Sequence, residues 1–417
     1  MSLNTMTDIL LRLILVVFVL MAIGCSKEEN TITGPPENIP NAANVYMDST
    51  QQIIRGFGGQ NMPGWSDVGD LTTTQVEKAF GTGAGQIGMT ILRIRVPYDS
   101  TKFNLEVPTA QLAKSLGAII FASPWTPPPS MKSNNNIVGG ILNTGSYADF
   151  ANYLKAFADY MSSNGAPLYA VSLQNEPDVH VGYESCDWNA TQMLNFVKNN
   201  TPAIGTKIIV PESYKFDHAM SDPILNDPAA AANISIIGGH LYGEGALTSY
   251  PLATSKGKEV WMTEHIVDCA NWPYAFEVAV EINGCMNAGM SAYVLWYIRR
   301  GYGPIDESGN ITKGGYFMSQ YARFVRPGYY RVSATANPQT NIDVTAYKSG
   351  SKVVIVVLNS GSSISQTFTI QHGTVSTYTP YVTSSSKNCI QESDITVSNG
   401  IFTVTLDSSS VTTFVSN

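Results

Sequence analysis

YAVSLQNEP, at residues 169–177, begins as a short run of small and β-branched residues and closes on a polar pair before a proline. Such a run is typical of a strand that is buried in a parallel sheet. Seven similar runs, separated by longer stretches, occur at IIRGFGG (53–59), ILRIRV (91–96), AIIFASPW (118–125), KIIVPES (207–213), SIIGGHLY (235–242), EVWMTEH (259–265) and SAYVLWY (291–297). Eight such strands with helices between them predict an α/β fold, the (β/α)8 TIM barrel.

The stretches between the runs show helical spacing. Apolar side chains recur three and four positions apart in residues 146–163 and 275–289, which we expect to lie in the outer ring of helices. A doubly wound open sheet is the alternative, but no glycine-rich phosphate loop follows the first run. Beyond Tyr330 the pattern changes to alternating strands such as VVIVVL and FTVTL, with a turn at Asn399-Gly400. This change predicts an antiparallel sheet domain at the C-terminus.

The composition favours an uncharged polymeric partner. Charged residues make up 13% of the 417 residues, against about a quarter in an average protein. The formal net charge is -8, and the resulting field repels nucleic acid and anionic lipid. We therefore expect no nucleic-acid partner, and an acidic substrate would have to be bound by local arginines.

The N-terminus is typical of an exported chain. An apolar run from Ile9 to Ile23 has the length of a signal-peptide core, and it ends in Ala22-Ile23-Gly24-Cys25, which looks like a bacterial lipobox. We expect a signal peptide at residues 1–24, lipidation of Cys25 and a tethering linker at 25–42, and hence a secreted, outer-membrane or cell-surface lipoprotein anchored to the membrane. The alternative is an ordinary signal peptide with a chance cysteine.

The remaining cysteines and the histidines indicate no metal site. Cys186, Cys269, Cys285 and Cys389 lack the short spacing of a zinc site, and no histidines form an H-E-x-x-H pair. We expect neither a metal nor another cofactor. A disulfide between Cys269 and Cys285 and buried free thiols remain alternatives.

Two predicted strands end in a glutamate. The run at 169–177 closes on Asn175-Glu176-Pro177, and the run at 259–265 closes on Thr263-Glu264-His265. In a TIM barrel the carboxyl ends of the strands meet at the active site, so both carboxylates should lie at its mouth. Retaining glycosidases use two carboxylates about 5 to 5.5 Å apart, one as acid/base and one as nucleophile. Each glutamate alone could equally be a capping carboxylate, but the pair predicts a glycosidase.

The sequence resembles glycoside hydrolase family 30 from about Arg55 to the C-terminus, and its last motifs resemble the glucuronoxylanases of subfamily 8. The motifs are GFGGQNMPGW, LRIRVPY, ASPWTPPPSMKSNN, LQNEPD, GHLYG, TEH, WYIRRGYG and GYFMSQYARFVRPGYYRV. The resemblance implies a catalytic barrel at 54–325 and an attached β side domain at 43–53 and 326–417. It also implies an endo-β-1,4-xylanase that cuts glucuronoxylan with retention, guided by a 4-O-methylglucuronosyl side group.

The resemblance also implies roles for the residues at the strand ends. Glu176 would be the acid/base, Glu264 the nucleophile, and Asn175 the partner of the sugar 2-hydroxyl. Arg95 would hold Glu264 ionised, Tyr242 would donate a hydrogen bond to Glu264, and His240 would position the site. A structural salt bridge is the alternative for Arg95, and a plain rim aromatic is the alternative for Tyr242.

Three tryptophans and one arginine are candidate sugar contacts. Trp65, Trp125 and Trp296 fall at predicted strand ends, where aromatic rings could stack on sugar faces. In the resembled subfamily an arginine at the position of Arg300 pairs with the glucuronate carboxylate, assisted by Tyr302. A solvated surface cation is the alternative for Arg300.

Two positions depart from the subfamily pattern. Ile266 and Cys269 stand where the subfamily has a tyrosine and a serine that contact the glucuronate, so the glucuronate requirement is in doubt. A family 30 endoxylanase or other β-glycanase without that requirement remains open, as does a surface glycan-binding lipoprotein without turnover. We expect a monomer.

Overall fold

The computed structural model describes residues 39–65, 69–243 and 247–417. The predicted signal peptide and the lipidation site Cys25 lie outside the described residues. None of the described helices is both long and apolar enough to cross a membrane.

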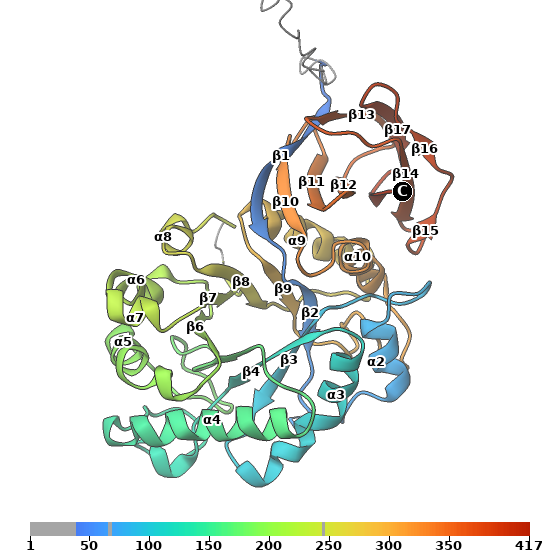
Figure 1. Cartoon of the computed structure of the whole chain (residues 1–417). Helices are drawn as coiled ribbons and strands as arrows, with labels where there is room; N and C mark the ends of the chain where they lie inside the picture. The colour runs from blue at the N-terminus through green and yellow to red at the C-terminus, as the bar shows by residue number, and fades with distance from the viewer. Residues whose placement is uncertain (1–38, 66–68, 244–246) are drawn as a thin grey trace, which may run out of the picture. The chain divides into compact units, whose positions relative to one another are not determined.

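Eight parallel strands close into a barrel, which confirms the predicted fold (Figure 1). Each strand pairs with the next along the chain, and β2 pairs with β9 to close the barrel. Seven fall within the runs predicted from the sequence, and β2 extends one residue beyond its run, to Gln60. The eight strands are β2 (Gly56–Gln60), β3 (Ile91–Val96), β4 (Ile119–Pro124), β5 (Ala170–Ser172), β6 (Lys207–Ser213), β7 (Ile236–His240), β8 (Glu259–Glu264) and β9 (Ala292–Leu295).

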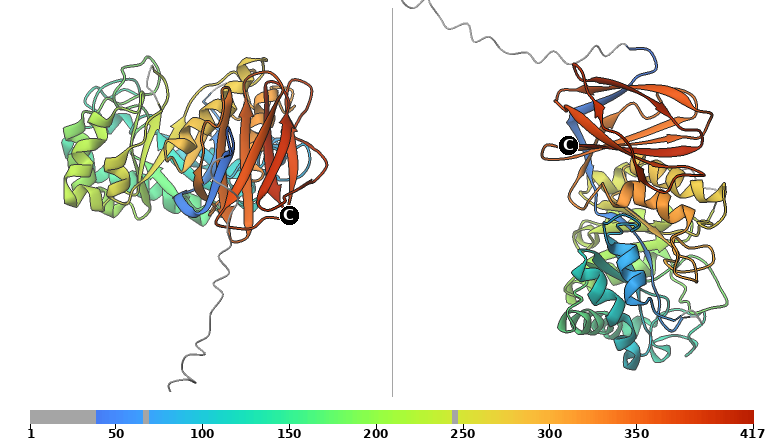
Figure 2. Two further views of the ribbon diagram at one scale, coloured as in Figure 1. Left: turned by 90° about the horizontal axis from the view of Figure 1, so that it is seen from above. Right: turned by 90° about the vertical axis from the view of Figure 1, so that its right-hand side faces the viewer.

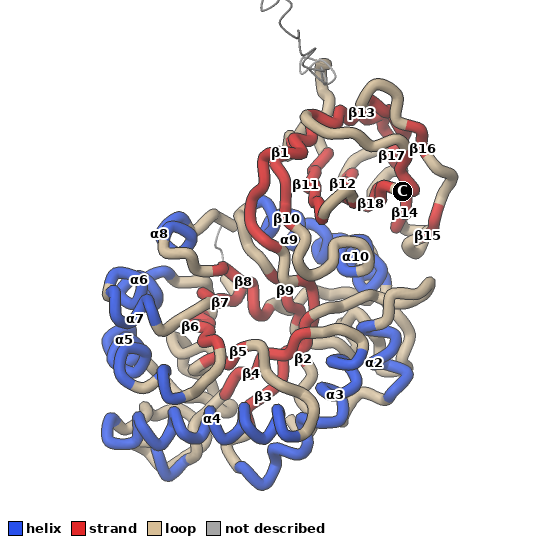
Figure 3. Tube along the Cα trace, viewed as in Figure 1, coloured by secondary structure: helices blue, strands red, loops and turns tan. Residues whose placement is uncertain are grey.

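Helices cover the outside of the barrel (Figure 3). The predicted helices at 146–163 and 275–289 are confirmed as α4 and α9, and α4 buries the apolar face that its spacing predicts. The helices are α2 (Thr73–Phe80), α3 (Val107–Ser115), α4 (Tyr147–Ser163), α5 (Ala190–Asn199), α6 (His218–Asn226), α7 (Pro228–Ala232), α8 (Pro251–Ser255), α9 (Glu277–Asn287) and α10 (Lys313–Ala322). Short 3₁₀ helices lie at Ser100–Glu106, Pro129–Met131, Thr144–Ser146, Thr201–Ala203 and Tyr274–Phe276.

The barrel interior below the mouth is filled by side chains. Large apolar residues from alternating strand positions, among them Phe121 and Trp261, pack edge to face at 5.9 Å. Close packing also explains the glycines of β2, because a Cβ on Gly58 would lie 1.9 Å from the backbone oxygen of Ile91. The filled floor leaves the carboxyl ends of the strands as the place where polar groups converge.

A second sheet combines the first strand with the C-terminal strands, as the resemblance implies. Figure 2 shows β1, in blue, beside the orange and red strands of this sheet. Its pairs are antiparallel except for β1 with β13. The strands are β1 (Ala43–Ile53), β10 (Tyr330–Ala334), β11 (Ile342–Ser349), β12 (Lys352–Asn359), β13 (Ile364–Gln371), β14 (Thr377–Thr383), β15 (Ile390–Gln391), β16 (Ile395–Thr396), β17 (Ile401–Leu406) and β18 (Ser410–Ser416).

Helix α10 joins the side sheet to the barrel. Gln320, which is fully buried, donates to the hydroxyl of Thr383 at 2.8 Å, and its backbone oxygen accepts from Thr413 at 2.7 Å. The Lys313 ammonium donates to the backbone oxygen of Ser384 at 2.8 Å. The barrel and the sheet belong to one compact unit, so the domain boundaries at 53/54 and 325/326 stay a prediction.

Candidate active site

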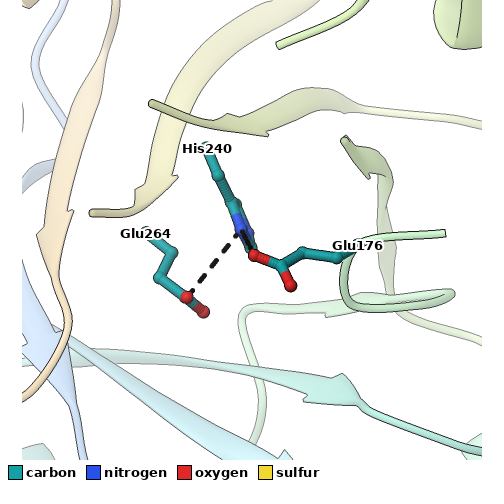
Figure 4. Close-up of side chains that lie close together, drawn as sticks. All are labelled: Glu176, His240 and Glu264. Carbon is teal, nitrogen blue, oxygen red and sulfur yellow. Dashed lines mark hydrogen bonds and ion pairs between the residues drawn. The ribbon is translucent and has the colours of Figure 1, made fainter. Parts of the chain in front are cut away.

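Glu176, His240 and Glu264 meet at the carboxyl ends of the barrel strands (Figure 4). His240 and Glu264 are the last residues of β7 and β8, and Glu176 follows β5. One atom from each side chain lies within 4.8 Å of the other two, and all three residues are buried. The sequence thus placed the two carboxylates at one mouth correctly.

Glu176 accepts a hydrogen bond on each carboxylate oxygen. His240 Nδ1 lies 3.0 Å from Oε1, and the Tyr183 hydroxyl donates to Oε2 at 3.0 Å. The backbone of Glu176 has a φ of 47°, in the left-handed region that non-glycine residues rarely occupy. Strain of this kind persists where surrounding contacts impose it, and here it aims the side chain into the mouth.

Glu264 is held from two sides. The Tyr242 hydroxyl donates to Oε1 at 2.9 Å, and the Arg93 guanidinium pairs with Oε2. Burial and the Glu264 charge raise the pKa of Tyr242, so its phenol stays a donor. Arg93 also donates to Asn175 Oδ1 at 2.8 Å, which leaves the amide nitrogen of Asn175 available to a ligand.

The expectation that Arg95 pairs with Glu264 is wrong. Arg93 and Arg95 are two residues apart on β3 and therefore point to the same side of the strand, but Arg93 lies one layer deeper. Arg95, at the layer nearer the rim, pairs with Glu184 at 3.1 Å and lies 5.7 Å from the centre of the Trp65 ring. The alternation along β3 therefore predicted the correct face of the strand for the arginine that pairs with Glu264, but the wrong depth in the barrel.

Glu212 is a third carboxylate that the sequence reasoning missed. It is fully buried at the end of β6, 3.1 Å from Arg93, and it accepts from the Ser123 hydroxyl at 2.6 Å. Burial alone would raise the pKa of Glu212, but Arg93 and His240 outweigh it and lower that pKa to about 2. The run KIIVPES also ends in a polar residue, so the criterion that found Glu176 could have found Glu212.

His240 carries positive charge at neutral pH. Burial disfavours the imidazolium, but the Glu264 charge, the hydrogen bond to Glu176 and the nearby Glu212 carboxylate raise the pKa of His240 to about 9. Its Nε2 lies 3.8 Å from Glu212. Two cations, Arg93 and His240, therefore face three carboxyl groups. The cluster is electrically neutral when one of these carboxyl groups carries a proton.

Aromatic side chains form the wall beside the carboxylates. The ring centres of Trp65 and Trp125 lie 5.7 Å apart, and those of Trp125 and Trp296 lie 5.8 Å apart. Trp125 is nearly fully buried with Arg93 4.8 Å from its ring centre, whereas Trp65 and Trp296 are partly exposed. The three predicted platform residues thus form one surface, to which Tyr183 adds an edge contact with Trp65 at 6.0 Å.

Arg300 and its neighbour Arg299 have different surroundings. The Arg300 guanidinium lies 4.7 Å from the ring centre of Tyr297, and Tyr302 packs against the same aromatic cluster, where the Arg300 charge opposes the rise in the Tyr302 pKa that burial causes. Arg299 instead donates to the backbone oxygen of Asp70 at 3.2 Å. Arg300 and Tyr302 are therefore brought together at the aromatic wall, as the sequence analysis expects.

The two positions that depart from the subfamily pattern, Ile266 and Cys269, differ in their exposure to solvent. Ile266 is 44% exposed, whereas Cys269 is buried and packs on Gly314, where an added Cβ would lie 2.5 Å from the Cys269 Cβ. Cys269 and the other three described cysteines are free thiols. The Cys269–Cys285 disulfide is therefore not formed, and the alternative of buried thiols holds.

The group of Glu176, His240 and Glu264 also has the ligand types of a metal site. However, each carboxylate oxygen already faces a protein hydrogen-bond donor, and two of these donors belong to the cations Arg93 and His240. A divalent cation here would lie against those positive charges. The arrangement is instead suited to proton transfer by one carboxylate and nucleophilic attack by the other.

A closed barrel with two buried carboxylates at its mouth is the architecture of many glycoside hydrolases. No family model matches the chain. The chain is 44% identical over 388 residues to glucuronoxylanase XynC of Bacillus subtilis, covering 89% of this chain and 91% of that protein.

Solved structures agree with this sequence similarity. A family 30 subfamily 8 xylanase, Xyn30A of Clostridium acetobutylicum, superposes with a TM-score of 0.85 at 42% identity, covering 90% of this chain and all of that one. A family 30 endoxylanase of Clostridium papyrosolvens gives a TM-score of 0.83 at 40% identity with the same coverage. The chain belongs to glycoside hydrolase family 30.

Proposed function

We propose that the protein is a retaining endo-β-1,4-xylanase that hydrolyses glucuronoxylan by double displacement. The observation that carries the mechanism is the approach of an oxygen of Glu176 to within 4.8 Å of an oxygen of Glu264. Retaining enzymes hold this pair about 5 to 5.5 Å apart, whereas inverting enzymes leave about 6.5 to 9.5 Å for a water molecule. The substrate is proposed from the relatives, which are a glucuronoxylanase and two xylanases.

In the first step Glu264 attacks the anomeric carbon while the bond to the leaving oxygen breaks. Glu176 gives its proton to that oxygen, which leaves as the hydroxyl of the departing chain. Arg93 and Tyr242 hold Glu264 in position, and the Asn175 amide meets the 2-hydroxyl of the reacting sugar. The proton that makes the cluster neutral is the one that Glu176 transfers.

In the second step a water molecule attacks the glycosyl ester, and Glu176 accepts a proton from that water. Esterification has removed the negative charge of Glu264, so the charges of Arg93, His240, Glu212 and ionised Glu176 now balance. Release of the sugar returns Glu264 to its carboxylate.

Recognition of a methylglucuronosyl side group is assigned to Arg300 and Tyr302. A guanidinium pairs well with a carboxylate, and Tyr302 packs against the same aromatic cluster as Arg300. The second candidate is a xylanase without strict glucuronate dependence. It is favoured by Ile266, which presents an apolar surface, and by Cys269, whose side chain is buried away from any ligand.

Mass analysis of the released oligosaccharides tests this substrate. We expect one methylglucuronate at a fixed position in each product from glucuronoxylan and little release from arabinoxylan. Equal cleavage of the two polymers would replace the proposal by the second candidate. If neither polymer releases oligosaccharides, the remaining interpretation is a glycan-binding protein without turnover.

We also propose export and lipidation of Cys25 from the segment Ala22-Ile23-Gly24-Cys25. Expression of the full chain in bacteria with a labelled fatty acid tests this. We expect the unchanged protein to carry the label and the Cys25→Ala variant to lack it. An unlabelled, freely secreted protein would indicate an ordinary signal peptide.

A further inference from the structure

A hollow of about 290 Å³ lies between the β8–α9 loop and two turns of the side sheet. The loop contributes Trp272 and Tyr274, the first residue of α9 contributes the Glu277 carboxylate, and the side sheet contributes Ser360 and Ser409. None of these residues belongs to the site formed by Glu176 and Glu264. We call this place the seam hollow.

Trp272 and Tyr274 are the exposed aromatic residues of the seam hollow, and they differ in how their rings are supported. The Trp272 ring stacks on Phe317 with centres 5.8 Å apart and planes at 28°, yet 39% of the residue is exposed. One face of the indole is thus supported from behind while other parts of the ring meet solvent. Tyr274 is 64% exposed. Exposed aromatic rings at a hollow are the kind of surface on which a sugar ring can stack.

The seam hollow lies at the same end of the barrel as the catalytic carboxylates. Helix α9 begins at Glu277 and returns antiparallel to the strands, so its first turn is at the carboxyl ends of β8 and β9 (Figure 1). The loop that carries Trp272 and Tyr274 starts directly after Glu264. The hollow is therefore reached from Glu264 through one loop that leaves the β8 side of the mouth.

The other lining groups decide which ligand fits. The serine hydroxyls can exchange hydrogen bonds with sugar hydroxyls, and the Glu277 carboxylate can accept them. Glu277 is the charged residue among the described lining residues, and it would repel a glucuronate carboxylate. Stacking rings with hydroxyl partners and one anionic acceptor suit a neutral sugar.

We propose that the seam hollow is an accessory binding site for a neutral, unsubstituted stretch of β-1,4-xylan. The inference rests on the proposed xylanase function for the identity of the sugar. It goes further, because it assigns a second site that holds long or insoluble substrate while the carboxylates cleave elsewhere on the polymer.

Affinity electrophoresis in gels that contain dissolved arabinoxylan, and in parallel gels that contain glucuronoxylan, tests the site. The variants are Tyr274→Ala, Trp272→Ala and Trp272→Phe, each combined with Glu264→Gln so that the polymer is not digested. Tyr330→Ala in the same background is the matched control, because Tyr330 is an exposed tyrosine of the side sheet outside the hollow. We expect retardation to weaken roughly fivefold to tenfold for the two alanine variants, and little for Trp272→Phe or the control.

Hydrolysis by the same variants with Glu264 intact gives a second readout. Release from insoluble xylan should fall severalfold for Tyr274→Ala, while cleavage of short xylo-oligosaccharides stays unchanged. Equal retardation of Tyr274→Ala and Tyr330→Ala would overturn the accessory site, as would a loss of retardation confined to glucuronoxylan. Failure of the proposed function is distinct, because the unchanged protein would then release no sugar from any xylan.

Discussion

The strand ends that carry Glu176, His240 and Glu264 differ from the loops that carry Ile266 and Arg300 in how their side chains are held. The first group is buried, and each carboxylate oxygen is hydrogen-bonded to a side chain from the barrel or its mouth. Ile266 is partly exposed on a loop, and Arg300 lies at the aromatic wall. The difference indicates that the barrel determines the reaction, whereas the loops determine which xylan is cut.

Replacing the proposed nucleophile should produce the largest effect. Glu264→Gln keeps the shape of the side chain but removes the charge that attacks the anomeric carbon, so kcat should fall by about four orders of magnitude. Steady-state hydrolysis of xylan measures this, with an unchanged thermal midpoint as the control for folding. Hydrolysis close to that of the unchanged enzyme would refute the assignment of Glu264.

Replacing Glu212 should show whether this residue acts through its charge or only through its packing. Glu212→Gln removes an anion that supports Arg93 and His240, so kcat/KM should fall by about a hundredfold. The pKa of His240 should fall as well, which shifts the alkaline limb of the pH profile of kcat/KM to lower pH.

Glu106→Gln is the matched control for this experiment. Glu106 is also fully buried, and burial raises the pKa of its carboxyl well above the usual value, but neither Arg93 nor His240 is among the charges that act on it. We expect it to leave the position of the pH profile unchanged. A profile that moves equally in both variants would show that Glu212 acts through packing alone.

Removing Arg300 should affect only substituted xylan. Arg300→Ala should lower kcat/KM on glucuronoxylan about tenfold, as expected for a lost charge-assisted hydrogen bond, and leave arabinoxylan unaffected. Arg299→Ala is the control, because Arg299 binds backbone oxygens at residues 69 and 70 instead. A similar loss on both polymers would remove Arg300 from glucuronate recognition.

Restoring a donor at position 266 should strengthen glucuronate dependence. Ile266→Tyr should raise the preference for glucuronoxylan over arabinoxylan about threefold, because one hydrogen bond to the side group is gained. Ile266→Phe offers the same ring without the hydroxyl and should leave the preference unchanged. If the two variants behave alike, ring size and not hydrogen bonding governs this position.

The smallest effect concerns stability against pH. The pKa of His240 is raised from 6.5 to about 9, so its contribution is fully present below pH 6.5 and is lost as the pH rises through about 9. The pKa of Glu212 is lowered from 4.5 to about 2, so its contribution is present above pH 4.5 and is lost as the pH falls through about 2. Both act fully between pH 4.5 and 6.5.

Differential scanning calorimetry between pH 6.5 and 9 checks this window. The thermal midpoint of the unchanged protein should fall by a few degrees more over this range than that of Glu212→Gln, whose imidazole is less strongly held in its charged form. Parallel curves for the two proteins would contradict the charge state assigned to His240.

The sequence predicted the barrel well because each strand is a short, wholly buried run with its own turn signals, as in ILRIRV. It placed Glu176 and Glu264 because strand ends converge in this fold. It assigned the partner of Glu264 to Arg95, whereas the structure shows Arg93 in that place. The face of a strand on which a side chain lies follows from alternation, but its depth in the barrel depends on how the strands pair. Tyr183 was missed because the loop that brings it to Glu176 has no periodic pattern.

Proton NMR of the first product formed tests the central role of the Glu176 and Glu264 pair most directly. Xylan cleaved in deuterated buffer should release the β-anomer at the new reducing end, which mutarotates only afterwards, because two displacements restore the original configuration. Initial release of the α-anomer would show a single displacement by water and would contradict the assignment of Glu264 as nucleophile.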